Sequence, residues 1–454
     1  MGFLDFFKRA IIGPTQSIEA TSQKHDRRTH QVSAAGRARK SSEFLRGCET
    51  DDEQKLRKKM MIELLRSLKG KEGLEACGLE YRLVTLGEDG KLVATTESDT
   101  SSQPTQDLIT NHFEEKKEEN PLVPPPTLRL SQRHAPPKPV INEISMTRLF
   151  HKESNTMITS TNRKEFIADG TMYDIVCRLA MEHSQELMIQ DGKLEWVTIP
   201  EEDPNNHQSP TNEPIRALVS SRIVQDESRL DTEPTLLVVT GKGHVRAGIF
   251  SRQHLLTSGL ECSSSVQFVH EARKRGMNLI VFDPNAHSDR FGMQTFEKSM
   301  THLFRRWEEA PETINVQQRS LYLLSHSQSG AQFVRYLLRK ADCYLPHINA
   351  IAFTDSTHNI QWTKRQNQKG LEELLESERS LYFKRTDKTV EYPFRPFSSI
   401  GRVVDTDQFW EHRFGKIKTL CAGTSEHSMT NWFARRNIWD HFDRFLLVET
   451  QAAS

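Results

Sequence analysis

Long apolar runs are absent from this sequence. Its 454 residues are 36% hydrophobic, and no window approaches the roughly 20 consecutive apolar residues that a membrane-spanning helix needs. This excludes an integral membrane protein built from helices. An excess of charge is also lacking, because 61 basic and 61 acidic side chains give a net charge of zero. A nucleic-acid binder that works by overall basicity is therefore not indicated.

Signatures of metals, disulfides and nucleotide cofactors are missing too. The six cysteines form no C-x-x-C pair, and neither an H-E-x-x-H motif nor a cluster of acidic ligands occurs. A P-loop would need glycine in place of Leu236, and a dinucleotide fingerprint would need glycine in place of Arg246. We therefore predict no metal, no cofactor and reduced thiols.

The first 164 residues are polar and divide into three predicted segments. Residues 1–50 form a basic tail, predicted to be disordered, whose Arg- and Ser-rich composition also resembles a mitochondrial transit peptide. Residues 51–96 predict an amphipathic helix, with Leu56, Met60, Leu64 and Leu65 at helical spacing, followed by a β-hairpin. Residues 97–164 predict a proline-rich linker. Basic stretches between residues 24 and 59 suggest weak RNA contact.

From residue 165 to 448 helix-length segments alternate with short apolar runs. Such runs predict a mainly parallel sheet covered on both faces, and hence an α/β three-layer domain. The predicted strands are 194–199, 215–220, 235–240, 278–283, 320–325, 348–354 and 417–422, and the clearest predicted helix is 172–187.

Candidate catalytic residues follow three of these strands, where the reactive loops of an open parallel sheet lie. Ser327, within Ser325-His-Ser-Gln-Ser-Gly330, has the pattern of a nucleophile elbow, although serine replaces glycine at positions 325 and 329. Asp355 and His427 come later, in the Ser–Asp–His chain order of hydrolases of this fold. In this hypothesis His427 takes the Ser327 proton and Asp355 orients the imidazole.

Each candidate also has a structural interpretation. Serine is a good helix N-cap, Asp355 fits the cap of the next helix, and His427 fits an ordinary loop histidine. Glu426 and His358 are alternatives to the acid and the base.

An oxyanion site is predicted from the loop Gly241-Lys-Gly-His-Val-Arg-Ala-Gly248. Gly241 and Gly243 let backbone N–H groups approach a ligand closely, and the N–H of Gln328 completes the predicted set of donors.

Four segments resemble a known family. They are Thr235–Gly248 with its V-R-A-G string, Gly276–Asn285, Ser325–Gly330 and Thr354-Asp-Ser-Thr-His-Asn359. Together they are similar to the Arb-two domain family, and the similarity covers about 165–448 and the hairpin. The resemblance implies an α/β-hydrolase-like fold with Ser327 at the elbow and Asp355 and His427 at the later positions. Ser329 departs from the glycine of the animal members.

The family resemblance also shapes the functional hypotheses. It implies an adaptor in RNA silencing, chromatin or co-transcriptional RNA regulation, with Argonaute, histone deacetylase, chromatin or splicing proteins as partners, in the nucleus or cytoplasm. The alternative is an active serine hydrolase of the esterase or thioesterase type that uses Ser327, Asp355 and His427. The adaptor is placed slightly ahead, because a fold does not fix a function.

Overall fold

The computed structural model describes residues 51–86, 92–94, 145–200, 214–309, 319–362, 368–386 and 400–452. The chain divides into two compact units, Met1–Glu80 with Arg148–Ser454, and Tyr81–Thr147. The predicted basic tail, residues 1–50, and the predicted linker up to residue 144 lie outside the described residues. No helix in the described ranges is long and apolar enough to cross a membrane.

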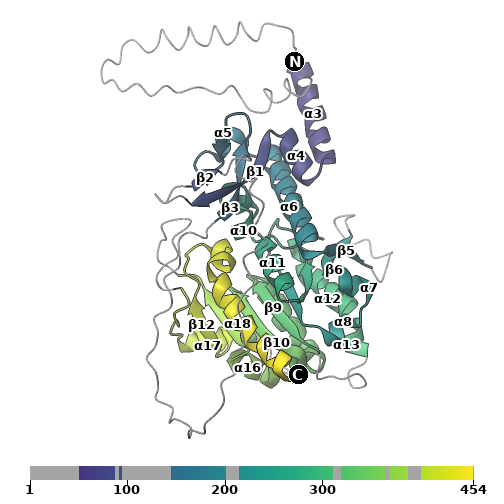
Figure 1. The fold of residues 1–454 in the computed structure, drawn as a ribbon, viewed down its shortest axis with the longest axis vertical. Coiled ribbons are helices and arrows are strands. Elements are labelled where there is room, and N and C mark those ends of the chain that lie inside the picture. Colours follow the sequence, from purple (N-terminus) through teal and green to yellow (C-terminus); the bar gives the residue numbers. More distant parts are fainter. Residues whose placement is uncertain are drawn as a thin grey trace, which may run out of the picture. The chain divides into compact units, whose positions relative to one another are not determined.

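An eight-stranded sheet lies at the centre of the larger unit (Figure 1). Its strands are β5 (Leu194–Ile199), β6 (Ile215–Ser220), β7 (Thr235–Val239), β8 (Asn278–Phe282), β9 (Leu321–His326), β10 (Ile348–Thr354), β11 (Ser380–Lys384) and β12 (Lys418–Cys421). Their order in the sheet is β12-β11-β10-β9-β7-β8-β6-β5. β6 runs antiparallel to both of its neighbours, and all other neighbouring pairs are parallel. This is the strand arrangement of the α/β-hydrolase fold.

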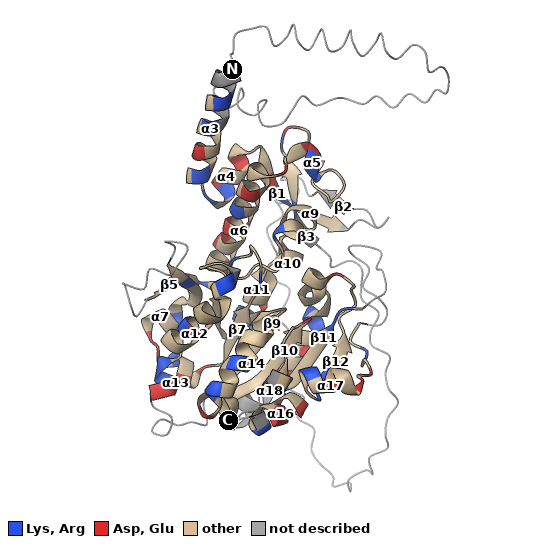
Figure 2. Ribbon diagram, turned by 180° about the vertical axis from the view of Figure 1, so that it is seen from behind, with Lys and Arg blue, Asp and Glu red and all other residues tan. Residues whose placement is uncertain are grey.

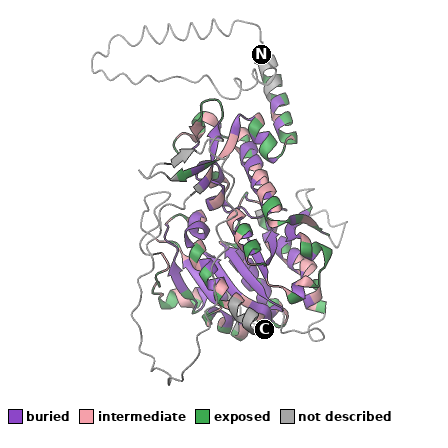
Figure 3. Cartoon of the chain, viewed as in Figure 1, coloured by how far each residue is buried: buried purple, intermediate pink, exposed green. Residues whose placement is uncertain are grey.

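The apolar runs become strands because both faces of the sheet are covered. Every position of β7, β8 and β9 is buried, and Figure 3 shows these central strands as a buried layer. The predicted strands 194–199, 215–220 and 348–354 match the observed bounds of β5, β6 and β10. The sequence does not predict β11, because its apolar stretch has only three residues, Leu381 to Phe383, between Ser380 and Lys384.

Helices cover both faces, which confirms the predicted three-layer α/β fold. On one face lie α11 (Val266–Lys274) and α18 (Thr430–Ala452), where the rings of Phe268 and Trp439 pack 6.1 Å apart (Figure 1). On the other lie α12 (Gly292–Leu303), α13 (Arg305–Glu309), α14 (Ser329–Arg339) and α16 (Gln368–Glu376), seen in front of the sheet in Figure 2. Shorter helices are α7 (Ser221–Gln225), α8 (Arg229–Thr232), α9 (Arg252–Thr257), α10 (Leu260–Ser263), α15 (Ala341–Tyr344) and α17 (Gln408–Phe414).

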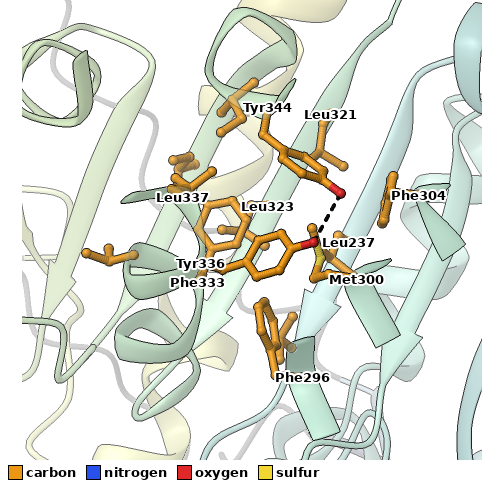
Figure 4. Packing of buried hydrophobic residues seen from close by; sticks show 14 of the residues in the cluster. Leu237, Phe296, Met300, Phe304, Leu321, Leu323, Phe333, Tyr336, Leu337 and Tyr344 are labelled. Atoms are coloured by element: carbon orange, nitrogen blue, oxygen red, sulfur yellow. Dashed lines mark hydrogen bonds between the residues drawn. The ribbon is translucent and has the colours of Figure 1, made fainter. Parts of the chain in front are cut away.

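The second of these faces carries an aromatic core (Figure 4). Phe296 packs edge-to-face on Phe282 of β8 at 5.6 Å and on Tyr336 of α14 at 6.0 Å. Phe304 packs on Trp307 and Tyr344 in the same manner, at 5.1 and 6.0 Å. Edge-to-face aromatic pairs add about 0.5–1.5 kcal/mol beyond the area they bury. This core anchors α14, the helix that follows Ser327.

The predicted amphipathic helix is observed as α3 (Asp51–Ser67), which belongs with α4 (Gly70–Ala76) to the larger unit. They contact α6 (Thr171–Gly192), the observed form of the predicted helix 172–187. Arg178 of α6 donates to the carbonyls of Leu65 and Leu68. Of the predicted apolar face of α3, Leu65 is buried, whereas the other members are exposed: Leu56, Met60 and Leu64.

Four short strands complete the described chain. β1 (Leu79–Leu86) and β2 (Leu92–Ala94) form the predicted antiparallel hairpin. The predicted linker 97–164 is wrong from residue 145 onward, where β3 (Ser145–His151) pairs antiparallel with β4 (Thr156–Met157) and α5 (Arg163–Phe166) follows. The prolines that predict the linker end before residue 141, and Met146, Leu149 and Phe150 are buried.

Candidate active site

Ser327 lies in a sharp turn between β9 and α14. Its φ of +58° falls in the left-handed region that side chains other than glycine rarely adopt. The turn is held by hydrogen bonds from the Ser327 N–H to the Thr354 carbonyl, 3.0 Å, and from the Gly330 N–H to the Ser327 carbonyl, 3.3 Å. A strained serine between a strand and a helix is the geometry of a nucleophile elbow.

The two serines that replace glycine in this elbow satisfy each other. Ser325 Oγ and Ser329 Oγ lie 2.8 Å apart, and Ser329 Oγ also donates toward the carbonyls of His326 and Val239. Both side chains are fully buried. A glycine is required one residue later, because a Cβ on Gly330 would lie 1.9 Å from Ser356 Oγ. The elbow therefore tolerates serine at 325 and 329 and depends on Gly330.

Asp355 and His427 come together although 72 residues separate them. Asp355 follows β10 in a left-handed conformation, φ +43°, with its N–H bonded to the Phe383 carbonyl. His427 begins the short helix η7 (His427–Met429), and its Nδ1 lies 2.5 Å from Asp355 Oδ2. A carboxylate only accepts hydrogen bonds, so Nδ1 donates and Nε2 is left to act as a base.

The imidazole of His427 lies beside the elbow. Its ring stacks on that of His326, the residue before Ser327, with centroids 4.7 Å apart and planes tilted by 32°. In the described residues, Ser327 Oγ and His427 share no hydrogen bond within 3.5 Å. Catalytic hydrogen bonds are often long in empty sites and tighten only when substrate binds.

The ring of His326, which stacks on that of His427, is uncharged. It is 2% exposed, and its Nδ1 lies 3.2 Å from Thr354 Oγ1, which in turn donates to Asn431. Burial, reinforced by the neighbouring His427, holds the pKa of His326 well below its usual value. His326 therefore stays uncharged and does not oppose protonation of the ring stacked on it.

The glycines predicted to form an oxyanion site differ in their distance from Ser327. A Cβ on Gly241 would lie 2.7 Å from Ser327 Cβ and 3.1 Å from its Oγ, so this backbone directly faces the Ser327 side chain. Gly243 has φ +137°, and a Cβ at this position would meet no atom within 4 Å. The N–H groups of Gly241 and Gln328 donate to no described residue, which leaves them available to an oxyanion.

Sequence reasoning missed the residue that fixes this loop. Asn285 Nδ2 donates to the carbonyls of Gly241, 2.9 Å, and Val245, 3.1 Å. Asn285 is 7% exposed and follows Asp-Pro after β8. A polar residue in a loop at the carboxyl end of a central strand is the signal that could have identified it.

The two predicted alternatives to the acid and the base, His358 and Glu426, have other partners. His358 is buried, with Nε2 3.0 Å from the Phe414 carbonyl and Nδ1 2.8 Å from Ser356 Oγ, and burial lowers its pKa to about 4. Glu426 pairs with His254, 3.6 Å away, and this contact lowers the pKa of Glu426 to about 2. Asp355 is therefore the acid that meets His427.

A cation that the sequence did not single out contacts the same carboxylate. Arg385 Nε lies 3.4 Å from Asp355 Oδ2, and 54% of the Arg385 side chain is exposed. For metals, no group of three His, Cys, Asp or Glu side chains that could hold an ion occurs within the described ranges.

Comparisons with known proteins give distant relatives. No family model matches the chain. It is 21% identical over 381 residues to the cotranscriptional regulator ARB2A homolog of Xenopus tropicalis, and 22% identical over 383 residues to human cotranscriptional regulator ARB2A. Each alignment covers 72% of this chain and 82% of the relative.

Solved structures that resemble the chain include two esterases. Est1E from Butyrivibrio proteoclasticus has a TM-score of 0.29 at 11% identity, covering 57% of this chain and 99% of that protein. The metagenomic carboxylesterase EstE1 has a TM-score of 0.26 at 14% identity, covering 41% and 56%. The fold itself is established by the order and directions of the eight strands. The resemblance indicated by the sequence motifs is confirmed by the similarity to these ARB2A proteins, and the order and directions of the described strands give an α/β-hydrolase-like domain.

Proposed function

We propose that the large domain is a serine hydrolase that cleaves an ester or thioester through Ser327, Asp355 and His427. The observation that carries the proposal is the 2.5 Å contact between His427 and Asp355 beside a serine held at φ +58°. Strained backbone and a carboxylate-bound histidine together are costly in a purely structural loop. Acyl transfer is the chemistry that uses both.

In this mechanism His427 Nε2 removes the proton of Ser327 Oγ as the oxygen attacks the carbonyl carbon. Asp355 holds the imidazole through Nδ1 and stabilises its charged form. The N–H groups of Gly241 and Gln328, with Gly243 as the third predicted donor, stabilise the oxyanion. His427 then returns the proton to the leaving group, and water hydrolyses the acyl-enzyme by the same steps in reverse.

A fluorophosphonate probe tests this function directly. The wild-type protein should be labelled at Ser327, and Ser327→Ala should lose the label. Ser428→Ala is a matched control, because Ser428 lies next to His427 but donates its hydroxyl to Glu426. Equal labelling of wild type and Ser327→Ala would remove the hydrolase from consideration.

The second candidate is an adaptor in co-transcriptional regulation. It is favoured by the relatives, which are named cotranscriptional regulators. On this proposal the chain acts in the nucleus or cytoplasm and its hydrolase-like domain binds an Argonaute, histone deacetylase, chromatin or splicing protein. The basic stretches between residues 24 and 59 add contacts to RNA. Both roles are compatible with one molecule.

Affinity purification separates the two candidates. A stable partner that is retained by Ser327→Ala supports the adaptor, because binding then needs the surface and not the nucleophile. RNA contact by the tail predicts an affinity that falls steeply with salt and is lost when residues 1–50 are deleted. A purified chain without a partner would count against the adaptor.

A further inference from the structure

Arg385 is fixed in place at the edge of the candidate site. It follows β11, whose carboxyl end lies between those of β10 and β12. The next residue, Thr386, donates its N–H to the Thr424 carbonyl, 2.8 Å away, in the loop that leads to His427. The backbone on both sides of the guanidinium is therefore held, while 54% of the side chain remains exposed to solvent.

Arg385 and His427 share one oxygen of the catalytic carboxylate. Asp355 Oδ2 lies 2.5 Å from His427 Nδ1 and 3.4 Å from Arg385 Nε. When His427 accepts the serine proton, two cations then face the same oxygen. Because like charges at such distances repel, Arg385 opposes formation of the imidazolium that Asp355 is there to stabilise. The resting arrangement is thus unfavourable for catalysis.

A second cation lies in the loop that follows β7. Lys242 follows Gly241, whose backbone faces the Ser327 side chain, and it is exposed. Lys242 has no ion pair with any described residue. The neighbouring carboxylates are engaged elsewhere, since Asp283 pairs with Arg246 at 3.6 Å and Glu426 pairs with His254 at 3.6 Å. Among the described residues of these loops, Lys242 is therefore a cation without an ion pair, and Arg385 is an exposed cation whose partner is Asp355.

We propose that the substrate is an ester or thioester that carries an anionic group, a carboxylate or a phosphate, recognised by Lys242 and Arg385. The proposal rests on the hydrolase function of the same site. When the substrate anion pairs with Arg385, the guanidinium leaves Asp355 Oδ2. The carboxylate of Asp355 then contacts His427 alone. Arg385 therefore favours anionic substrates by binding them, and it lowers the turnover of neutral substrates, which leave it paired with Asp355.

Three chromogenic esters of similar length test this specificity. One has a neutral acyl chain, one a terminal carboxylate on the acyl chain, and one a phosphate on the alcohol. The wild-type kcat/KM should be roughly tenfold higher for at least one anionic ester than for the neutral ester, because the anion forms exposed ion pairs with two cations. The preference should shrink as salt is added. Which of the two anionic esters has the higher kcat/KM shows whether the site prefers a carboxylate or a phosphate.

Substitutions give the sharper test. Arg385→Gln should raise kcat/KM for the neutral ester several-fold and abolish the preference, whereas Arg385→Lys should retain part of it. Lys242→Gln should lower turnover of the anionic ester alone. Lys369→Gln is the matched control, because Lys369 lies on α16, which precedes the opposite end of β11, and pairs with Glu373. Equal losses on neutral and anionic esters in Arg385→Gln would mean that Arg385 only positions Asp355, and would overturn the proposal.

Binding to Ser327→Ala separates this proposal from the hydrolase function. The monoester of glutaric acid and a phosphate monoester should bind this variant, and the binding should weaken with salt and with Arg385→Gln. If Ser327 is unreactive in the wild type but this binding persists, the hydrolase fails and the anion site stands. If neither anion binds, or if Ser327 is reactive but neutral and anionic esters are cleaved equally, the anion site is rejected.

Discussion

The aromatic core and the edge of the same sheet that carries Ser327 and Asp355 are built in opposite ways. In the core, Phe296, Phe304 and Tyr344 are fully buried, and no residue of the apolar cluster has a positive φ. At the edge, Ser327 and Asp355 both have left-handed backbones. Each such residue costs on the order of 1–3 kcal/mol, a cost that surrounding packing must offset. The comparison teaches that packing in the core stabilises the fold, and that this stability offsets the cost of the left-handed residues at the edge.

The largest expected effect is on turnover. His427→Ala should lower kcat/KM for the best ester by roughly 10⁴-fold, because the general base is lost. The free energy of unfolding should stay within about 0.5 kcal/mol, since the imidazole is partly exposed. Ester kinetics and urea unfolding measure the two quantities. If His427→Ala instead lowered the free energy of unfolding strongly and left kcat/KM unchanged, the roles assigned to the two regions would be contradicted.

The core should respond in the opposite sense. Phe304→Ala should lower the free energy of unfolding by about 3–5 kcal/mol, because it opens a cavity between Trp307 and Tyr344. Under conditions where the variant is folded, Ser327 should still react with the fluorophosphonate. Phe409→Ala is the control, since Phe409 is 71% exposed and should change stability little. Equal effects of the two substitutions would refute the assignment of the core.

Acid should destabilise the domain through buried histidines. Burial lowers the pKa of His358 from its ordinary 6.5 to about 4. Below pH 6.5 the unfolded chain binds a proton that the folded chain does not, so stability is complete above 6.5 and falls as the pH drops toward 4. His358→Gln should reduce the loss between about pH 7.5 and about pH 5 by on the order of 2 kcal/mol. His270→Gln is the matched control for the loss of a histidine, since His270 is exposed.

The smallest effect concerns strain at the nucleophile. Ser327→Gly should be more stable than Ser327→Ala by about 1 kcal/mol, because glycine adopts φ +58° without a Cβ clash. Both variants lack the hydroxyl, so both should be inactive. Thermal or urea unfolding of the pair measures the difference. If alanine proved as stable as glycine, the elbow would hold no strain.

Much of the fold follows from the sequence because buried parallel strands have a simple pattern. The run 348–354 is short, mostly apolar and flanked by helix-length segments, and it forms β10. β11 was missed because its apolar stretch has only three residues, between Ser380 and Lys384. β3 was missed because the proline-rich composition before it dominated the interpretation. Periodicity detects burial, and these strands give it little signal.

The site was predictable only as far as chain order goes. Ser327, Asp355 and His427 each follow a strand, and topology then brings Asp355 and His427 together. Asn285 could have been singled out by its place after β8, but its partners could not be predicted, and neither could the contact of Arg385 with Asp355, because both depend on which loops meet in space. The serines at 325 and 329 seemed to weaken the elbow in sequence, yet their mutual hydrogen bond lets both fit.

The most direct test of the central claim is a crystal structure of the protein after reaction with a phosphonate ester. The account predicts a phosphonyl group on Ser327 Oγ, with His427 Nε2 within about 2.6–3.2 Å of that oxygen. The phosphonyl oxygen should lie about 2.7–3.1 Å from the N–H groups of Gly241 and Gln328. An unmodified Ser327, or an imidazole that remains out of reach of the adduct, would contradict it.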